Sequence, residues 1–223
     1  MGADMVWHRG LSLALFALGL MSVGCSNSDP PKNPDDVKPE HTYKGLEGQT
    51  CAVMVYADWR TRVDYNRIQG DLAQFVQQRI ETLVKGDGEE KQDKKNAATQ
   101  TRFLNPLSVV RYQREHPQIE GEPITEVAPR LGVSRLIYIE LTQFSAQSPE
   151  SIMILKGTAL ASLRVLEISG GKATVAFEES GILTRYPPDA PEGVVPSDKY
   201  TVPKIYKGTL ERLADKIALR FAE

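Results

Sequence analysis

The first 25 residues constrain this chain most, because they separate an export signal from the part that folds. Arg9 and the free amino terminus give a weakly positive start, from which Asp4 subtracts. An uncharged apolar run follows from Leu11 to Met21. That run is too short to span a bilayer, which takes about 20 residues, but it fits the apolar region of a secretory signal. We therefore predict that residues 1–24 are a signal peptide.

The signal ends in Ser22-Val23-Gly24-Cys25. A cysteine directly after Gly24 resembles a lipobox, in which the signal is cleaved before Cys25 and that residue is acylated, with palmitate among the acyl groups. Ser22 departs from the leucine that is usual there, and the alternative is an ordinary secretory signal with an incidental cysteine. Two or more acyl chains make a stable anchor. Ser26 resembles the default sorting signal for the outer membrane, so we expect a lipid-anchored protein that faces the periplasm.

Composition limits the partners of the mature chain. The formal net charge is −2, and the signal contributes one acid and one base, so the balance stays near zero after cleavage. Such a charge gives no reason to expect binding to nucleic acid. No second apolar run approaches bilayer length, so attachment to the membrane rests on the acyl chains. We infer no cofactor and no small-molecule substrate, and we expect another envelope protein as the partner.

Residues 25–45 are predicted to be the lipidated cysteine and a disordered tether. The segment 26–44 is polar and holds four prolines, so it cannot bury enough apolar surface to offset the entropy of ordering. Its reach is about 60 Å at about 3.1 Å per residue, the rise of extended polyproline-like chain. Residues 46–223 are then left for a single folded domain.

The first half of that domain alternates between strand and helix signals. The apolar run Ala52–Tyr56 predicts a buried strand, and the spacing of apolar residues over Tyr65–Val84 predicts a helix with Asp64 as its N-cap. Phe103-Leu104 indicates a short strand end. Two shorter helices are predicted over residues 105–114, with Asn105 and Pro106 at the start, and over 124–131, closed by Gly132.

The second half reads as strands followed by one helix. Strands are predicted over Arg135–Phe144, over the second half of Ile152–Ile168 and over Ala173–Tyr186. Ser169–Lys172 is a tight hairpin signal. The stripe of apolar residues over Val202–Phe221 predicts an amphipathic final helix.

This order of elements predicts an α/β (α+β) fold with a mixed β-sheet of four to five strands. A helix between the first strands favours parallel pairing, and hairpins favour antiparallel pairing. We expect the helices mainly on one face of the sheet. The C-terminal helix should dock on the sheet beside the Tyr65–Val84 helix, against the small side chains of Ala159 and Ala161. The alternative is that it offers its apolar stripe to a partner.

The order of elements also resembles a known family. Leu131-Gly132-Val133, the strand Leu136–Ile139, and the strand Ala161–Ile168 before a glycine turn are similar to the α/β domain of CsgG-type secretion lipoproteins, the amino-terminal domain of TolB and LpoB-type activators of penicillin-binding proteins. The resemblance implies this fold and an accessory role in the envelope. Residues 140–142 are Glu-Leu-Thr where the family commonly has a glycine, and no pair of membrane-inserting hairpins is evident.

No catalytic or metal-binding motif is present in the sequence. His8 lies in the signal, His41 in the tether and His116 in a Glu-His-Pro turn, and none has the spacing of metal ligands. Glu178 and Glu179 are adjacent on a strand, which sends their side chains to opposite faces. We therefore predict a protein that is not an enzyme, with no catalytic residues and no metal site.

Cys51 is the only cysteine left if Cys25 is acylated, so no internal disulfide is possible. It opens an apolar run and is interpreted as a small buried hydrophobe. The alternative is a reactive thiol, which would need a basic neighbour.

Candidate contact residues with a partner are Trp59 and Arg60, just after the first strand, and Tyr186, at the end of the last one. Trp, Tyr and Arg are frequent anchors of protein interfaces. The alternative is that both aromatic residues close off the core. The leading hypothesis is an envelope assembly factor, accessory subunit or activator that acts through protein–protein contacts. The alternatives are an envelope hydrolase with an unrecognised site and a subunit of a secretion complex.

Overall fold

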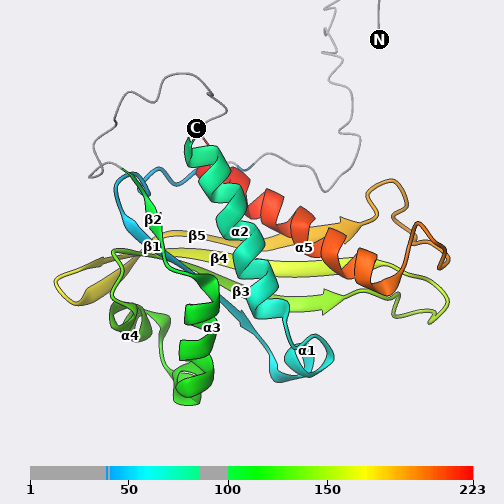
Figure 1. Cartoon of the computed structure of the whole chain (residues 1–223), viewed down its shortest axis with the longest axis horizontal. Coiled ribbons are helices and arrows are strands. Elements are labelled where there is room, and N and C mark those ends of the chain that lie inside the picture. The colour runs from blue at the N-terminus through cyan, green and yellow to red at the C-terminus, as the bar shows by residue number, and fades with distance from the viewer. Residues whose placement is uncertain (1–38, 40, 86–99, 223) are drawn as a thin grey trace, which may run out of the picture. The chain divides into compact units, whose positions relative to one another are not determined.

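A computed structural model describes residues 39, 41–85 and 100–222, and a five-stranded sheet in the order β2-β1-β3-β4-β5 lies at its centre (Figure 1). β1 pairs in parallel with β2 and β3, whereas β3, β4 and β5 pair antiparallel. The predicted mixed sheet is thus confirmed with five strands. The predicted signal and lipidation site, Gly24 and Cys25 included, and most of the tether lie outside the described residues. The strands are β1 Thr50–Ala57, β2 Arg102–Phe103, β3 Arg135–Ser145, β4 Gly157–Ser169 and β5 Lys172–Tyr186.

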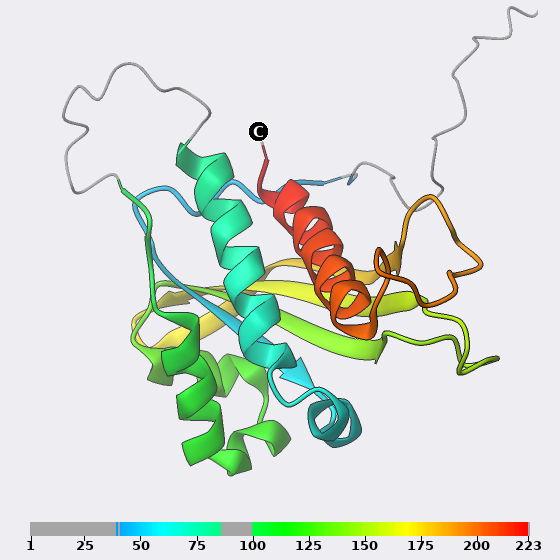
Figure 2. The ribbon, with the colours of Figure 1, turned by 45° about the vertical axis from the view of Figure 1, so that its right-hand side comes forward.

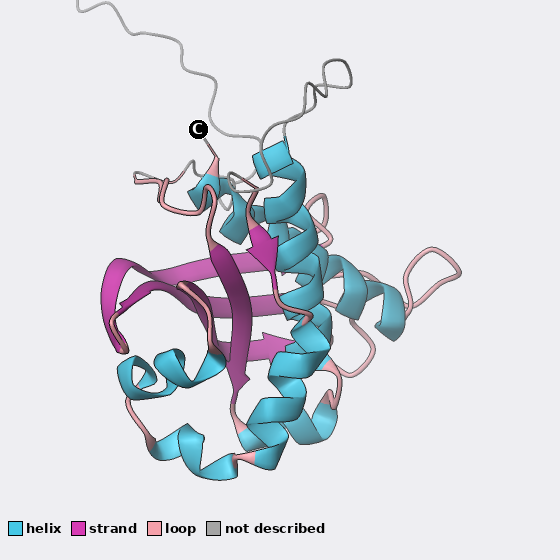
Figure 3. Cartoon of the chain, turned by 60° about the vertical axis from the view of Figure 1, so that its left-hand side comes forward, coloured by secondary structure: helices cyan, strands magenta, loops and turns pink. Residues whose placement is uncertain are grey.

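The two long helices lie side by side on one face of the sheet (Figure 2). Short helices cover part of the opposite face, mainly over β1 and the start of β5 (Figure 3). None of the helices within the described residues is both long and apolar enough to span a bilayer. The helices are α1 Trp59–Asp64, α2 Ile68–Lys85, α3 Pro106–Glu115, α4 Ile124–Val127 and α5 Val202–Ala218, with 3₁₀ turns η1 Pro117–Gly121, η2 Ala128–Leu131 and η3 Leu219–Phe221.

The predicted start of the long helix after β1 is wrong. Asp64, expected as its N-cap, instead ends the separate helix α1, and α2 begins only at Ile68. Tyr65 breaks the helix because its ring packs against two other aromatic rings, Phe144 at 4.8 Å and Tyr206 at 5.6 Å between centroids. This contact holds the backbone of Tyr65 at φ −133° and ψ 74°, outside the helical region.

Helix α5 docks on the sheet as predicted. Its apolar stripe is fully buried at Ile205, Leu210, Leu213 and Ile217, and α5 contacts α2, β4 and β5. The small residues of β4 allow the close approach. At Gly157 a Cβ atom would overlap the side chain of Thr209 on α5, so only glycine fits there.

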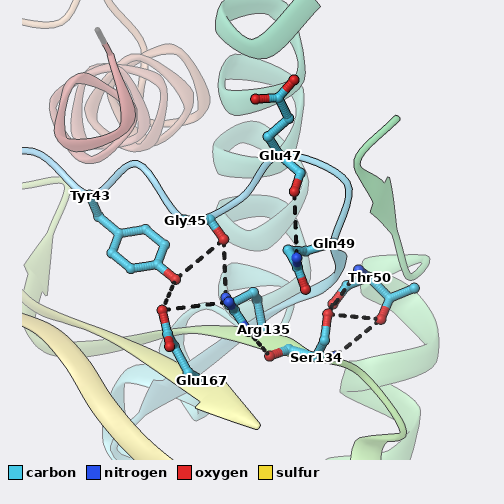
Figure 4. A network of polar contacts seen from close by, with 8 residues as sticks. All are labelled: Tyr43, Gly45, Glu47, Gln49, Thr50, Ser134, Arg135 and Glu167. Carbon is cyan, nitrogen blue, oxygen red and sulfur yellow. Dashed lines mark hydrogen bonds and ion pairs between the residues drawn. The ribbon is translucent and has the colours of Figure 1, made fainter. Parts of the chain in front are cut away.

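The chain before β1 is tied to the start of the sheet by a polar network (Figure 4). The hydroxyl of Tyr43 donates to Glu167 at 2.8 Å, and Arg135 donates from Nε to the carbonyl of Gly45 at 3.0 Å. The Tyr43 ring packs edge-on against Phe221, with 6.2 Å between centroids. Within the part of the chain that the structure describes, buried packing therefore starts at Tyr43, inside the segment 25–45 that we predicted to be tether.

Candidate functional site

A cavity of about 310 Å³ lies between the sheet and the segment that runs from η1 into α4. Its volume is at the small end of the range of about 300–1,000 Å³ for ligand pockets. The sheet provides a floor whose residues are register neighbours, with Met54 opposite Tyr138 and Tyr56 opposite Glu140. The floor is Met54, Tyr56, Tyr138, Glu140 and Arg164, and the walls are Gln113, Ile119, Glu120, Glu122, Pro123 and Ile124.

Gln113 lines this cavity and is held there by the edge of β1 that has no neighbouring strand beyond Cys51 in the described part of the chain. β2 pairs with β1 only at Thr50 and Cys51, so the carbonyl of Val55 meets no strand on that side among the described residues. Two amides satisfy it instead. Gln69 of α2 donates to Val55 O at 2.8 Å, and Gln113 of α3 donates at 3.0 Å. Since a carbonyl can only accept, the Gln113 atom that faces it must be Nε2.

The other end of the Gln113 amide is unsatisfied. Gln113 is only 8% exposed, and its Oε1 atom has no hydrogen-bond partner among the described residues. A buried polar atom without a partner costs about 1–3 kcal/mol. Native proteins hold few such atoms, and each calls for an explanation such as a bound water or ligand.

Most charged side chains at the cavity are paired. Glu120 forms a two-point ion pair with Arg62 of α1, with oxygen–nitrogen distances of 2.5 and 2.9 Å. Glu122 pairs with Arg130 at 2.5 Å. These contacts join α1, η1 and η2 around the rim.

Glu140 differs from these carboxylates. Among the described residues, no basic group lies within ion-pair distance of Glu140. Arg164 on the neighbouring strand interacts with Glu140 at longer range but is held at 2.7 Å by Glu178. The hydrogen bond from Arg164 to Glu178 is the main cause of the raised pKa of Arg164. Glu140 is thus the one cavity carboxylate of the described chain left without an ion pair.

Tyr138 gives the floor an apolar character despite its hydroxyl. Burial, the largest cause, and the negative charge of Glu140 together raise the pKa of Tyr138 to about 12. The phenol therefore stays neutral at physiological pH. Its side chain lines the cavity and interacts electrostatically with the carboxylate of Glu140.

Helix α1 lies at the rim and exposes a pair of apolar side chains. Trp59 is 68% exposed and Val63 is 70% exposed, and a spacing of four residues places them on one face of the helix. Asp58 caps the helix by accepting from the backbone N–H of Thr61 at 3.0 Å, and this bond lowers the pKa of Asp58. Arg62, on the same helix, reaches Glu120 at the cavity.

The structure separates the contact residues predicted from the sequence. Trp59 and Arg60 are exposed on α1 beside the cavity, and Trp59 does not close the core. Tyr186, by contrast, packs against the core, and a Cβ atom added at Gly208 of α5 would overlap its ring. Tyr186 and the α1 residues therefore do not form one surface.

Neither Cys51 nor His116 lines the cavity. Cys51 is fully buried in the core, and burial raises its pKa to about 12, as expected for a small hydrophobe. His116 stacks on Tyr112 with 4.3 Å between centroids, and its Nδ1 lies 2.9 Å from the Tyr112 carbonyl. No group of three or more potential metal ligands occurs within the described ranges.

Sequence reasoning missed the cavity residues Gln113, Glu120, Glu122 and Glu140. One weak signal was present, since a polar residue at 140 follows Tyr138 on the same face of a strand that otherwise reads as apolar. The walls come from separate segments, and only the fold brings them to that strand.

Comparison with known proteins gives distant similarity of structure. No family model matches the chain, and no curated protein matches it. Among solved structures, the PelC dodecamer from Paraburkholderia phytofirmans is 7% identical, with 81% of this chain and 92% of that chain covered and a TM-score of 0.36. Lipoprotein GNA1162 from Neisseria meningitidis is 14% identical, covering 74% and 98%, with a TM-score of 0.38. Hypothetical protein CT253 from Chlamydia trachomatis is 12% identical, covering 78% and 98%, with a TM-score of 0.34. These similarities do not single out the CsgG, LpoB or TolB families.

Proposed function

We propose that this protein is an outer-membrane-anchored lipoprotein of the periplasmic face that acts through protein–protein contacts, as an assembly factor or activator in the envelope. The observation that carries the proposal is the exposed pair Trp59 and Val63 on a capped helix beside a cavity. A tryptophan left in water beside polar groups is typical of an interface anchor. The sequence Ser22–Cys25 supports the lipid anchor.

The position of α1 suits an anchored protein. Tyr43, whose backbone N–H donates to the carbonyl of Arg220, precedes the start of β1 by a few residues, and α1 follows the end of β1. The eight residues of β1, at about 3.3 Å each, separate these two points by roughly 25 Å. A contact site at α1 therefore lies at the end of β1 opposite to Tyr43.

The lipid anchor is tested by metabolic labelling of cells with a fatty-acid probe. Wild-type protein should take up the label, and a Cys25→Ala variant should not. An unlabelled wild-type protein would remove the lipoprotein part of the proposal.

The contact site is tested by photo-crosslinking in intact cells. A benzophenone amino acid placed at Trp59 should give a defined crosslinked product with another envelope protein. The same amino acid at Leu219, which is also exposed but lies in η3 at the other end of the fold, is the matched control. Equal products from both positions, or none from position 59, would refute α1 as the contact site.

A secretion-complex subunit, the alternative from the sequence, would form large oligomers. A monomer on size-exclusion chromatography in detergent would count against it.

A further inference from the structure

We propose that the cavity between η1–α4 and the sheet binds an organic cation with N–H donors, a guanidinium or ammonium group on an apolar stem. The natural source that we assign is an arginine or lysine side chain of the protein partner. Binding of the cation stands independently of the proposed function, but its assignment to a partner's side chain rests on that function.

Hydrogen-bond accounting favours a donor ligand. Gln113 Oε1 is a buried acceptor with no partner, and the bond from Nε2 to Val55 fixes its orientation. Glu140 adds a carboxylate without an ion pair. An anion or an acceptor-rich ligand would leave Gln113 Oε1 without a donor and would place negative charge or acceptors beside the carboxylate of Glu140, whereas guanidinium and ammonium groups carry donors only.

The charge balance favours a cation. Three carboxylates and one guanidinium line the cavity. Glu120 and Glu122 are each paired with an arginine from outside the lining, and Arg164 is paired with Glu178. After this pairing, the formal charge that remains belongs to Glu140.

The walls favour a cation on an apolar stem. Tyr56 and Tyr138 contribute aromatic side chains to the floor, and Met54, Ile119 and Ile124 contribute apolar side chains to the lining. Ring faces attract guanidinium and ammonium groups, while alkyl stems pack on apolar surface. The volume of about 310 Å³ suits a single side chain better than a large metabolite.

The first test is calorimetric titration of the full-length protein in detergent. N-acetyl-L-arginine amide is compared with N-acetyl-L-citrulline amide, a neutral analogue of the same shape. We expect arginine to bind with a dissociation constant on the order of millimolar, and at least about tenfold more tightly than citrulline, because its bonds are charge-assisted. Equal affinities, or no binding by arginine, would overturn the proposal.

Two variants locate the site. Glu140→Gln keeps the shape and removes the charge, so it should weaken arginine binding about tenfold. Glu126→Gln makes the same change of net charge on α4 but at an exposed position that does not line the cavity, and it should bind as the wild type does. Equal affinity of Glu140→Gln and wild type would refute the site. Far-UV circular dichroism of both variants confirms folding.

The source of the cation is tested with the crosslink at position 59. If a partner's side chain occupies the cavity, Glu140→Gln and an excess of N-acetyl-L-arginine amide should each reduce the crosslinked product, whereas Glu126→Gln should not. An undiminished crosslink, together with specific binding of arginine amide, would overturn the assignment to the partner and leave a site for a free amine. Absence of any crosslink would reject the proposed contact function, while the calorimetric result would still decide whether the cavity binds a cation.

Discussion

The substitution Leu213→Ala measures how firmly α5 holds the sheet. Leu213 is 0% exposed and belongs to the core cluster shared by α2, α5 and the sheet. The change removes about three methylene equivalents at about 0.8 kcal/mol each, or roughly 2.4 kcal/mol of transfer free energy. The cavity left behind adds to this, and buried Leu→Ala changes total about 2–5 kcal/mol.

The surroundings of Leu213 place the expected loss in the upper part of that range. Helix α5 contacts α2 on one side and both β4 and β5 on the other, so the neighbours cannot easily collapse into the space. We expect about 3–5 kcal/mol, a large share of the 5–15 kcal/mol typical of folded proteins.

The assay is urea denaturation of the full-length protein, followed by far-UV circular dichroism. The midpoint should fall while the slope with urea stays the same. Leu107→Ala is the matched control, because Leu107 is 62% exposed on α3 and its truncation should change stability by no more than about 0.5 kcal/mol. If Leu213→Ala behaves like Leu107→Ala, α5 does not dock in solution and its stripe is available to a partner.

Three shorter predictions follow from other contacts. Cys51 is buried with its pKa raised to about 12, so a maleimide should label it in urea but not in the native protein at pH 7. Because the pKa of Asp58 is lowered in the folded protein, its helix cap should stabilise α1 above about pH 4, and this stabilisation should be lost as the pH falls further. The fluorescence of Trp59 should report the loss, and the variant Asp58→Asn should show no such pH dependence. Gly208→Ala should lower the melting temperature because the new Cβ atom would overlap the ring of Tyr186. Gly121→Ala should leave it unchanged, because a Cβ atom there meets nothing within 4 Å.

Local features of this fold could be predicted because neighbouring residues determine them. Asn105 caps α3 through a bond to the backbone N–H of Leu107, and Pro106 is the first residue of that helix, as the dipeptide indicated. Gly132 adopts φ 68° where the sequence placed the end of a helix. Each of these positions depends on contacts within a few residues along the chain.

The start of α2 and the cavity could not be predicted in the same way. Tyr65 interrupts the helical pattern through contacts with Phe144 and Tyr206, which are distant in the sequence. Arg62 and Glu120 are 58 residues apart, yet their ion pair joins α1 to the cavity rim. Helical spacing alone carries no information on such partners.

The final prediction concerns Gln113. Its replacement should leave the stability of the protein unchanged or raised, but should lower the affinity for arginine amide. Val55 O accepts from both Gln69 and Gln113, so loss of one donor leaves the carbonyl satisfied by the other. Gln113→Met also removes the unpartnered Oε1, whose burial costs about 1–3 kcal/mol. We therefore expect Gln113→Met to be neutral or stabilising in urea titration and to lose affinity for arginine amide.

Gln69→Met is the control, because it removes a donor without removing an unpartnered atom. Its free energy of unfolding should fall by about 0.5–1.5 kcal/mol, and its affinity for arginine amide should stay the same. A buried glutamine that lowers the stability of the protein but raises its affinity for a ligand is expected to serve binding. If the free energy of unfolding falls more for Gln113→Met than for Gln69→Met, then Gln113 is a structural residue that satisfies the edge of β1. That result would refute its proposed role as the acceptor for a bound cation.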